Sequence, residues 1–80
     1  MNRNNLPDYL FEILNDLGGR ATIVETCKHF WDKYETELRA SDDLFYTWQY
    51  DIRWAATELR KTDRMIDASS SERGMWELNK

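Results

Sequence analysis

The sequence predicts a mainly α-helical domain with a C-terminal β-hairpin. Three stretches carry apolar residues at the 3.6-residue spacing of an amphipathic helix, and after Lys61 the spacing changes to two, as in a strand. The 80 residues are enough for a single domain with one core. Four Trp, four Tyr and three Phe supply large apolar side chains, so we expect a compact core despite the short chain.

The first predicted helix begins at Leu6 and Pro7, because proline suits the first turn of a helix. Leucine or isoleucine then recurs at i+4, i+7, i+8 and i+11 from Leu6. Gly18 and Gly19 are expected to end this helix, since glycine adopts the left-handed backbone conformation at helix C-termini without steric cost. The polar residues 1–5 before it are expected to be disordered.

The second predicted helix begins after Thr22, which forms a capping-box pattern with Glu25 three residues later. Residues 20–22 are long enough only for a turn or a short strand. The apolar positions of this helix are Ile23, Cys27, Phe30, Trp31 and Tyr34. Polar residues 35–43 predict a loop in which Leu38 is the anchor to the core.

The third predicted helix, Leu44–Lys61, has two contrasting faces. Its apolar face is formed by Phe45, Trp48, Ile52, Ala55, Ala56 and Leu59. Its opposite face carries Tyr46, Tyr50, Arg53, Thr57, Arg60 and Lys61. Aromatic, hydroxyl and cationic side chains of this kind can reach base edges and phosphates in a DNA major groove. A helix face that is simply solvated has the same composition.

Residues 65–68 and 74–78 alternate apolar and polar positions and are predicted to pair as a β-hairpin around the turn-rich residues 69–73. The side chains expected to face the helices are Ile66, Trp76 and Leu78. Three helices followed by a hairpin is the order of a winged helix-turn-helix, in which the third helix enters the groove and the hairpin, or wing, lies along the backbone. A plain three-helix bundle is the alternative.

The motifs that point to a known family are Trp54-Ala55, Leu59, Lys61, Met65-Ile66, Arg73-Gly74-Met75-Trp76-Glu77-Leu78 and, at the end of the first helix, Leu17-Gly18-Gly19. Together they resemble the winged-helix domain at the N-terminus of Mrr-type, methylation-directed restriction endonucleases. The resemblance runs over about residues 10–78. It implies a winged-helix fold whose third helix faces DNA.

The chain departs from this family pattern at two places on or near the third helix. The family tends to have Asn-Arg where this chain has Tyr50-Asp51, and Ala-Gly where it has Thr62-Asp63. The first departure removes an arginine expected to contact DNA, and Asp51 is expected to repel phosphate there. No nuclease domain follows in this sequence, so we expect no DNA cleavage.

Charge and composition exclude several other functions. The net charge of −4 predicts weak non-specific affinity for DNA. Residues 1–42 hold 5 basic and 8 acidic residues, whereas residues 43–80 hold 6 basic and 7 acidic residues. Any basic face must therefore lie in the second half of the chain. Cys27 is expected to be buried and His29 to be a solvated surface residue. Two such residues are too few for a metal site, and at i, i+2 on a helix their side chains point in different directions and cannot act as a nucleophile and its base. We therefore expect no cofactor and no enzymatic activity. A lone cysteine and the lack of any membrane-spanning apolar run favour a cytoplasmic protein.

We therefore predict a non-catalytic protein that binds double-stranded DNA, such as a small transcriptional or phage or mobile-element regulator acting as a homodimer. The predicted DNA-binding residues are Tyr50, Arg53, Thr57, Arg60, Lys61 and Arg73. Arg53, with Tyr50 and Thr57 beside it, is assigned to base edges, and the other three cations are assigned to phosphates. The alternative is a winged helix that binds a protein partner through exposed aromatic residues, with Trp54 as a wing support or as an anchor for the partner.

Overall fold

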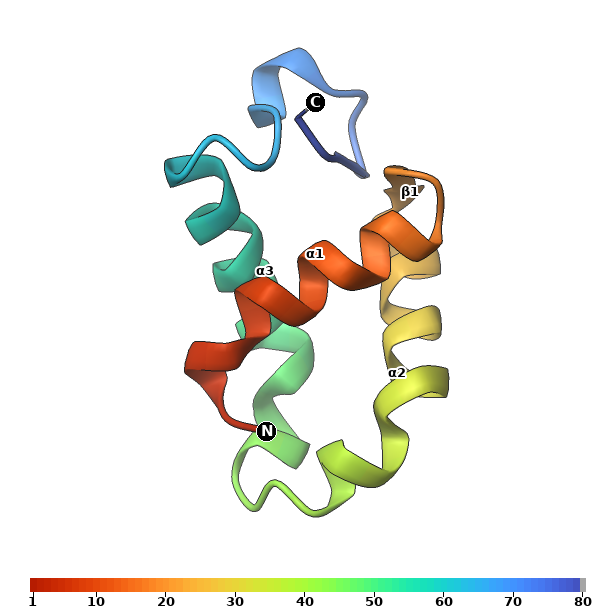
Figure 1. Ribbon diagram of the computed structural model, residues 1–80, viewed down its shortest axis with the longest axis vertical. Coiled ribbons are helices and arrows are strands. Elements are labelled where there is room, and N and C mark those ends of the chain that lie inside the picture. Colours follow the sequence, from red (N-terminus) through yellow and green to blue (C-terminus); the bar gives the residue numbers. More distant parts are fainter. Residues whose placement is uncertain (80) are drawn as a thin grey trace.

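The computed structural model describes residues 1–79, which form a helical body with a small sheet at one end (Figure 1). The elements are α1 (Leu6–Asp16), β1 (Arg20–Thr22), α2 (Ile23–Arg39), α3 (Leu44–Lys61) and β2 (Met75–Glu77), with short 3-10 helices η1 (Arg3–Asn5) and η2 (Ala68–Ser70). In Figure 1, α1 crosses in front of α3, and α2 runs along the other side of the body. The predicted mainly α-helical architecture is confirmed.

The prediction that residues 1–5 are disordered is wrong. Residues 3–5 form η1, and Asn2 caps its start: the Asn2 side chain accepts a hydrogen bond from the backbone N–H of Asn4, and the Asn5 side chain accepts one from the backbone N–H of Asn2. The guanidinium of Arg3 lies 3.8 Å from the centre of the Trp54 ring and 3.4 Å from Oδ1 of Asp51. Contacts between cation and ring and between opposite charges thus hold the N-terminus against α3, which polar composition alone does not reveal.

The boundary between α1 and α2 follows the predicted local rules. Gly18 and Gly19 have φ of 87° and 90°, so both occupy the left-handed region that favours glycine. Thr22 Oγ1 accepts a hydrogen bond from the backbone N–H of Glu25, and the Glu25 carboxylate accepts one from the N–H of Thr22, both at 3.0 Å. The predicted capping box is therefore confirmed, and it fixes the start of α2 directly after the short strand β1.

The loop predicted over residues 35–43 is wrong for most of its length, because α2 continues to Arg39. The helix is kinked at Tyr34, where φ is −121° and ψ is 19°. Leu38 is fully buried, as expected of an anchor, but it belongs to α2 and not to a loop. Glu35 and Arg39 form an i, i+4 ion pair at 2.8 Å. The polar composition of this segment reflects an exposed helix face and not a loop.

The core lies between the three helices, and α3 contributes the largest share of it. Trp48, Ile52 and Leu59 are buried, so the predicted phase of α3 is confirmed. The Trp48 ring is stacked on Phe30, with ring centres 5.6 Å apart, and on Trp31, with centres 6.0 Å apart. This aromatic stack joins α2 to α3 and supplies much of the apolar area of a small core.

The C-terminal hairpin is only partly as predicted. The main partner of β2 is β1, with which it pairs in antiparallel fashion so that Ala21 lies opposite Trp76. Met65 forms an isolated antiparallel bridge to Leu78, the residue directly after β2. The predicted strand 65–68 is wrong: apart from the bridge at Met65 these residues are not in a strand, and Ala68 already belongs to the 3-10 helix η2. The backbone N–H of Ile66 still donates to the carbonyl of Glu77 at 3.1 Å.

Packing of the C-terminal segment also corrects one predicted core residue. Trp76 and Leu78 are buried as expected, but Met65 is buried in place of the half-buried Ile66. The segment of residues 62–74, which we call the connector, joins α3 to β2 and lies beside the C-terminal part of α3 (Figure 1). This arrangement is compatible with a winged helix. None of the helices in residues 1–79 combines the length and apolar character that crossing a membrane requires.

Candidate nucleic-acid interface

Ion pairing divides the cationic side chains into two groups. Arg and Lys side chains within 4.0 Å of a carboxylate are Arg3, Arg20, Lys33, Arg39, Lys61 and Arg64. Over residues 1–79, the remaining ones are Lys28, Arg53, Arg60 and Arg73. All four line one or both of two adjoining grooves on α3. Within residues 1–79, the positive charge without an ion-pair partner is therefore concentrated in two adjoining grooves of a protein whose net charge is −4.

The first groove, called here the wing groove, lies between α3 and the connector. Its lining residues are Ile23, Arg53, Thr57, Arg60, Ala68, Ser71, Glu72, Arg73, Gly74, Met75 and Trp76. Four of the six predicted DNA-binding residues meet in it, three from α3 and Arg73 from the connector. Sequence phase placed the α3 residues on one face, and the return of the chain to pair with β1 brings the connector beside them.

Two contacts shape the electrostatics of the wing groove. Nε of Arg60 donates to the carbonyl of Ile66 at 3.2 Å, so this half-buried arginine also fixes the start of the connector. Glu72, the acidic residue of the groove, lies 3.2 Å from Nη2 of Arg20, which reduces its opposition to the neighbouring Arg73. The lining consequently carries a net positive charge and presents hydroxyl and guanidinium groups, which can donate hydrogen bonds to phosphate oxygens.

The other two predicted residues, Tyr50 and Lys61, do not line the wing groove. Tyr50 is on the exposed face of α3 as expected, with 76% of its surface accessible. Lys61 is also exposed, but its Nζ lies 3.0 Å from the Glu58 carboxylate, so its charge is already paired.

Asp51 was expected to face the phosphates, and that expectation is wrong. Only 8% of its surface is accessible, and its carboxylate accepts hydrogen bonds from Thr47 Oγ1 at 2.8 Å and from Arg3 Nε at 3.4 Å. In helical phase, position 51 lies on the opposite side of Trp48 from Ile52, so its side chain falls at the edge of the core face. The negative charge of Asp51, which departs from the family pattern, is thus paired with Arg3 of the N-terminal segment.

The second groove, called here the interhelix groove, lies between α2 and α3 and was missed at the sequence level. Its lining residues are Ile23, Val24, Cys27, Lys28, Trp31, Asp32, Phe45, Trp48, Gln49 and Arg53. Cys27, expected to be buried, is only half-buried in this groove; burial raises the pKa of its thiol, while the charge of Arg53 acts in the opposite direction. The sequence signal that could have indicated this groove is an apolar, β-branched residue on the solvent side of the helix, namely Val24, which is 64% exposed.

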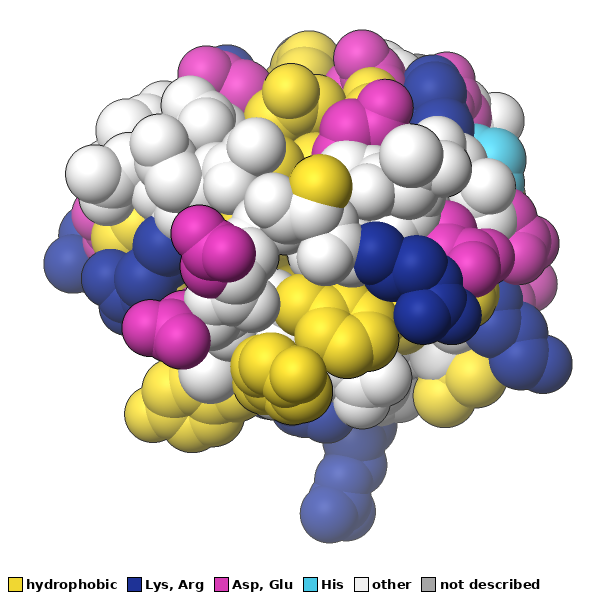
Figure 2. Space-filling model, turned by 90° about the horizontal axis from the view of Figure 1, so that it is seen from below, with side chains coloured by type: hydrophobic (Ala, Val, Ile, Leu, Met, Phe, Trp, Pro, Cys, Tyr) yellow, Lys and Arg dark blue, Asp and Glu magenta, His cyan; other side chains and the backbone are white. Residues whose placement is uncertain are grey.

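Exposed apolar side chains continue from this groove towards the α2–α3 connection. Figure 2 views that end of the molecule and shows apolar side chains gathered on the lower half of the face, with Lys or Arg side chains on both sides. Tyr46 is 82% exposed and lies edge-on to Phe45, with ring centres 4.9 Å apart. The guanidinium of Arg39 lies 5.2 Å from the Trp31 ring centre and 5.5 Å from that of Phe45. Aromatic area of this kind is typical of binding surfaces.

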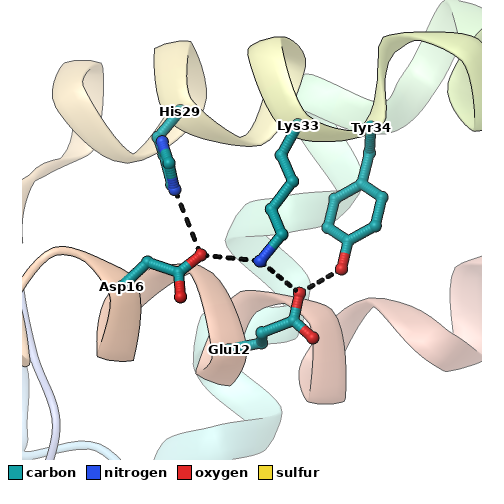
Figure 3. Close-up of polar contacts among 5 residues, drawn as sticks. All are labelled: Glu12, Asp16, His29, Lys33 and Tyr34. Atoms are coloured by element: carbon teal, nitrogen blue, oxygen red, sulfur yellow. Dashed lines mark hydrogen bonds and ion pairs between the residues drawn. The ribbon is translucent and has the colours of Figure 1, made fainter.

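A separate polar cluster joins α1 to α2 (Figure 3). Nζ of Lys33 lies 2.8 Å from Oδ2 of Asp16 and 3.1 Å from Oε1 of Glu12. Nε2 of His29 lies 3.1 Å from Oδ2 of Asp16, and the Tyr34 hydroxyl donates to Glu12. Hydrogen bonds from these partners lower the pKa of both carboxyls, and burial with the bond to Glu12 raises the pKa of Tyr34 to about 12.

This cluster explains why His29, expected to be a free surface histidine, is half-buried. Each drawn side chain has its partner within the cluster, and none of the five lines either groove. Its contacts span two helices, so we assign it the role of clamping α1 to α2. In the part of the chain that the structure describes, no three His, Cys, Asp or Glu side chains are grouped in a way that could hold a metal ion.

Comparison with protein-family models, curated proteins and solved structures gives no match for this chain. The resemblance to the Mrr-type winged-helix domain therefore stays a prediction.

Proposed function

We propose that this protein is a winged helix-turn-helix protein that binds double-stranded DNA through α3 and the connector. The observation that carries the proposal is the meeting of Arg53, Arg60 and Arg73 in the wing groove. These are three of the four arginine and lysine side chains that, among residues 1–79, have no carboxylate within 4.0 Å. A random distribution of free charge over the surface would not favour one helix and the adjacent loop in this way.

The strand pairing supports the same fold. In a winged helix the strand before the second helix pairs with the strand that closes the wing, which places the third helix and the wing on the same side. Here β1 precedes α2 and pairs with β2, which follows the connector. Gly74, with φ of 78°, allows the tight return into β2.

The contacts divide the predicted roles between the residues. Arg53 is exposed near the middle of α3, so we assign it to base edges together with Thr57. Arg73, at the exposed tip of the connector, is assigned to a phosphate. Arg60 is assigned to a phosphate too, although its bond to Ile66 gives it a structural role as well. Tyr50 and Lys61 are peripheral, because they lie outside the wing groove.

The small number of free cations has a consequence for assembly. Only two arginines per chain, Arg60 and Arg73, are assigned to phosphates, so one domain alone would bind DNA weakly at physiological salt. We therefore propose that the protein acts as a homodimer on two half-sites about one helical turn apart. This also suits a small regulator that needs sequence preference more than non-specific affinity.

The proposal can be tested by selecting bound duplexes from a random DNA pool and measuring their affinity by fluorescence anisotropy. Arg53→Ala should weaken binding to the selected site by about 1–3 kcal/mol and relax sequence preference. Arg39→Ala is the matched control, since it removes the same charge from an arginine that lies outside both grooves and is paired with Glu35. No enrichment of any sequence, or equal losses for both variants, would rule the proposal out.

A second candidate function is protein binding, and the exposed aromatic residues favour it. Tyr46 and Tyr50 are the most exposed large apolar side chains of the described chain, at 82% and 76%. An interface centred on such residues depends on apolar contact and responds weakly to salt, whereas DNA binding weakens steeply as salt rises. The salt dependence of the first ligand captured therefore separates the two functions.

A further inference from the structure

We infer that the interhelix groove is a docking site for an amphipathic helix of a partner protein, one that carries acidic residues beside its apolar face. The groove is bounded by two long helices, α2 and α3, which is the setting in which a third helix buries an apolar face. The inference that a partner docks stands on the contacts of this groove; only its effect on DNA binding rests on the proposed function.

The apolar character of the site comes from side chains that the fold leaves uncovered. Trp48 is buried beneath the groove, stacked on the half-buried Trp31, and so provides a rigid aromatic floor. Val24 stands exposed on one wall, and the half-buried Phe45 forms part of the other. A rigid floor loses little conformational entropy on binding, which favours docking of a preformed apolar face.

The charges at the rim identify the partner chemistry. Lys28 from α2 and Arg53 from α3 line opposite walls, and neither lies within 4.0 Å of a carboxylate of residues 1–79. Asp32, one turn after Lys28, is the one acidic residue among the described residues of the lining, so the two cations give this rim a net positive charge. A partner helix with Glu or Asp flanking its apolar residues would pair with both cations.

Arg53 links this site to the proposed DNA interface, because it lines both grooves. A guanidinium that pairs with the carboxylate of a docked helix is not available to a base or a phosphate. The docked partner and DNA should therefore compete, so that the partner would release this protein from its DNA site.

The docking site can be tested with the intact chain and a displayed library of 16-residue helical peptides. All peptides carry apolar residues at i, i+3, i+4 and i+7, and their flanking positions are either Glu or Lys. We expect the selected peptides to be Glu-flanked and to bind at least threefold more tightly than their Lys-flanked counterparts. Backbone amide shifts of the labelled protein should change in both walls of the groove. Selection of Lys-flanked peptides, or of none, would overturn the inference, as would shift changes elsewhere.

Variants at exposed positions give a second, independent test that does not endanger the fold. Val24→Ser should weaken the selected Glu-flanked peptide about tenfold, whereas Tyr46→Ser, which removes a more exposed aromatic side chain outside the groove, should change it less than twofold. Lys28→Glu should shift the preference towards the Lys-flanked peptide. Equal effects of the two serine variants, or an unchanged preference in Lys28→Glu, would refute the assignment.

Failure of the docking site and failure of DNA binding can be told apart by measuring both ligands on three variants. Arg53→Ala should weaken both, Arg73→Ala should weaken DNA alone, and Val24→Ser should weaken the peptide alone. In wild type, saturating peptide should raise the apparent Kd for DNA. If DNA does not bind at all, the peptide measurements still decide the docking site. If both ligands bind the wild-type protein together without loss of affinity, the competition is refuted.

Discussion

Replacing Leu59 with alanine should lower the free energy of unfolding by about 3–4 kcal/mol. The side chain is fully buried in α3 and belongs to the single core cluster. The change removes three carbon atoms, about 2.4 kcal/mol at roughly 0.8 kcal/mol per buried carbon group. A residual cavity of about 40 Å³ adds roughly 1 kcal/mol. Helix propensity contributes little, because leucine and alanine are both good helix formers.

A loss of this size is a large part of the total stability of a small domain, about 4–12 kcal/mol for 80 residues. Urea unfolding followed by helical circular dichroism should therefore show a clearly lower midpoint with an unchanged slope. Thr57→Ala, an exposed site on the same helix, is the control and should change stability by no more than about 0.5 kcal/mol. Equal midpoints for the two variants would show that the assigned phase of α3 is wrong.

Three further predictions concern the N-terminus, pH and assembly. Asp51→Asn removes the charge that pairs with Arg3, so it should speed amide exchange around Arg3 and leave DNA affinity nearly unchanged. A stronger DNA complex would mean that position 51 faces phosphate. The folded protein lowers the pKa of Glu12 from 4.5 and that of Asp16 from 3.8, so both carboxylates stabilise the fold fully above about pH 4.5. This contribution is lost as the pH falls through the lowered pKa values. In Glu12→Gln, the melting temperature should therefore fall less steeply with acid than in the wild-type protein. Light scattering should give a dimer on DNA, and a monomer bound tightly to one half-site would contradict the assembly.

Sequence patterns predicted the parts of the fold that depend on local chemistry. The left-handed glycines at 18 and 19, the capping box at Thr22 and the phase of α3 all follow from preferences that act within a few residues. Long-range pairing could not be predicted in the same way. The three residues of β1 carry no strand pattern of their own, and only the return of the connector gives them a partner.

The candidate site shows the same division. Helical phase brought Arg53, Thr57 and Arg60 to one face, but the pairing of Lys61 with Glu58 depends on side-chain conformations that spacing does not determine. Polar composition misled in two places, at the N-terminus and at the end of α2, because exposed helical residues and loop residues have similar polarity. Asp51 was misplaced because its partner Arg3 is distant in the sequence.

The most direct test of DNA binding by the wing groove is the salt dependence of affinity for a selected duplex. Each lost phosphate contact should reduce the slope of log K against log salt by about 0.9. Arg73→Ala should therefore weaken binding to all sequences alike and reduce the slope by about one unit, while Arg39→Ala should leave the slope of the wild-type protein unchanged. A slope near zero for the wild-type protein, or the same reduction in both variants, would contradict DNA binding by the wing groove.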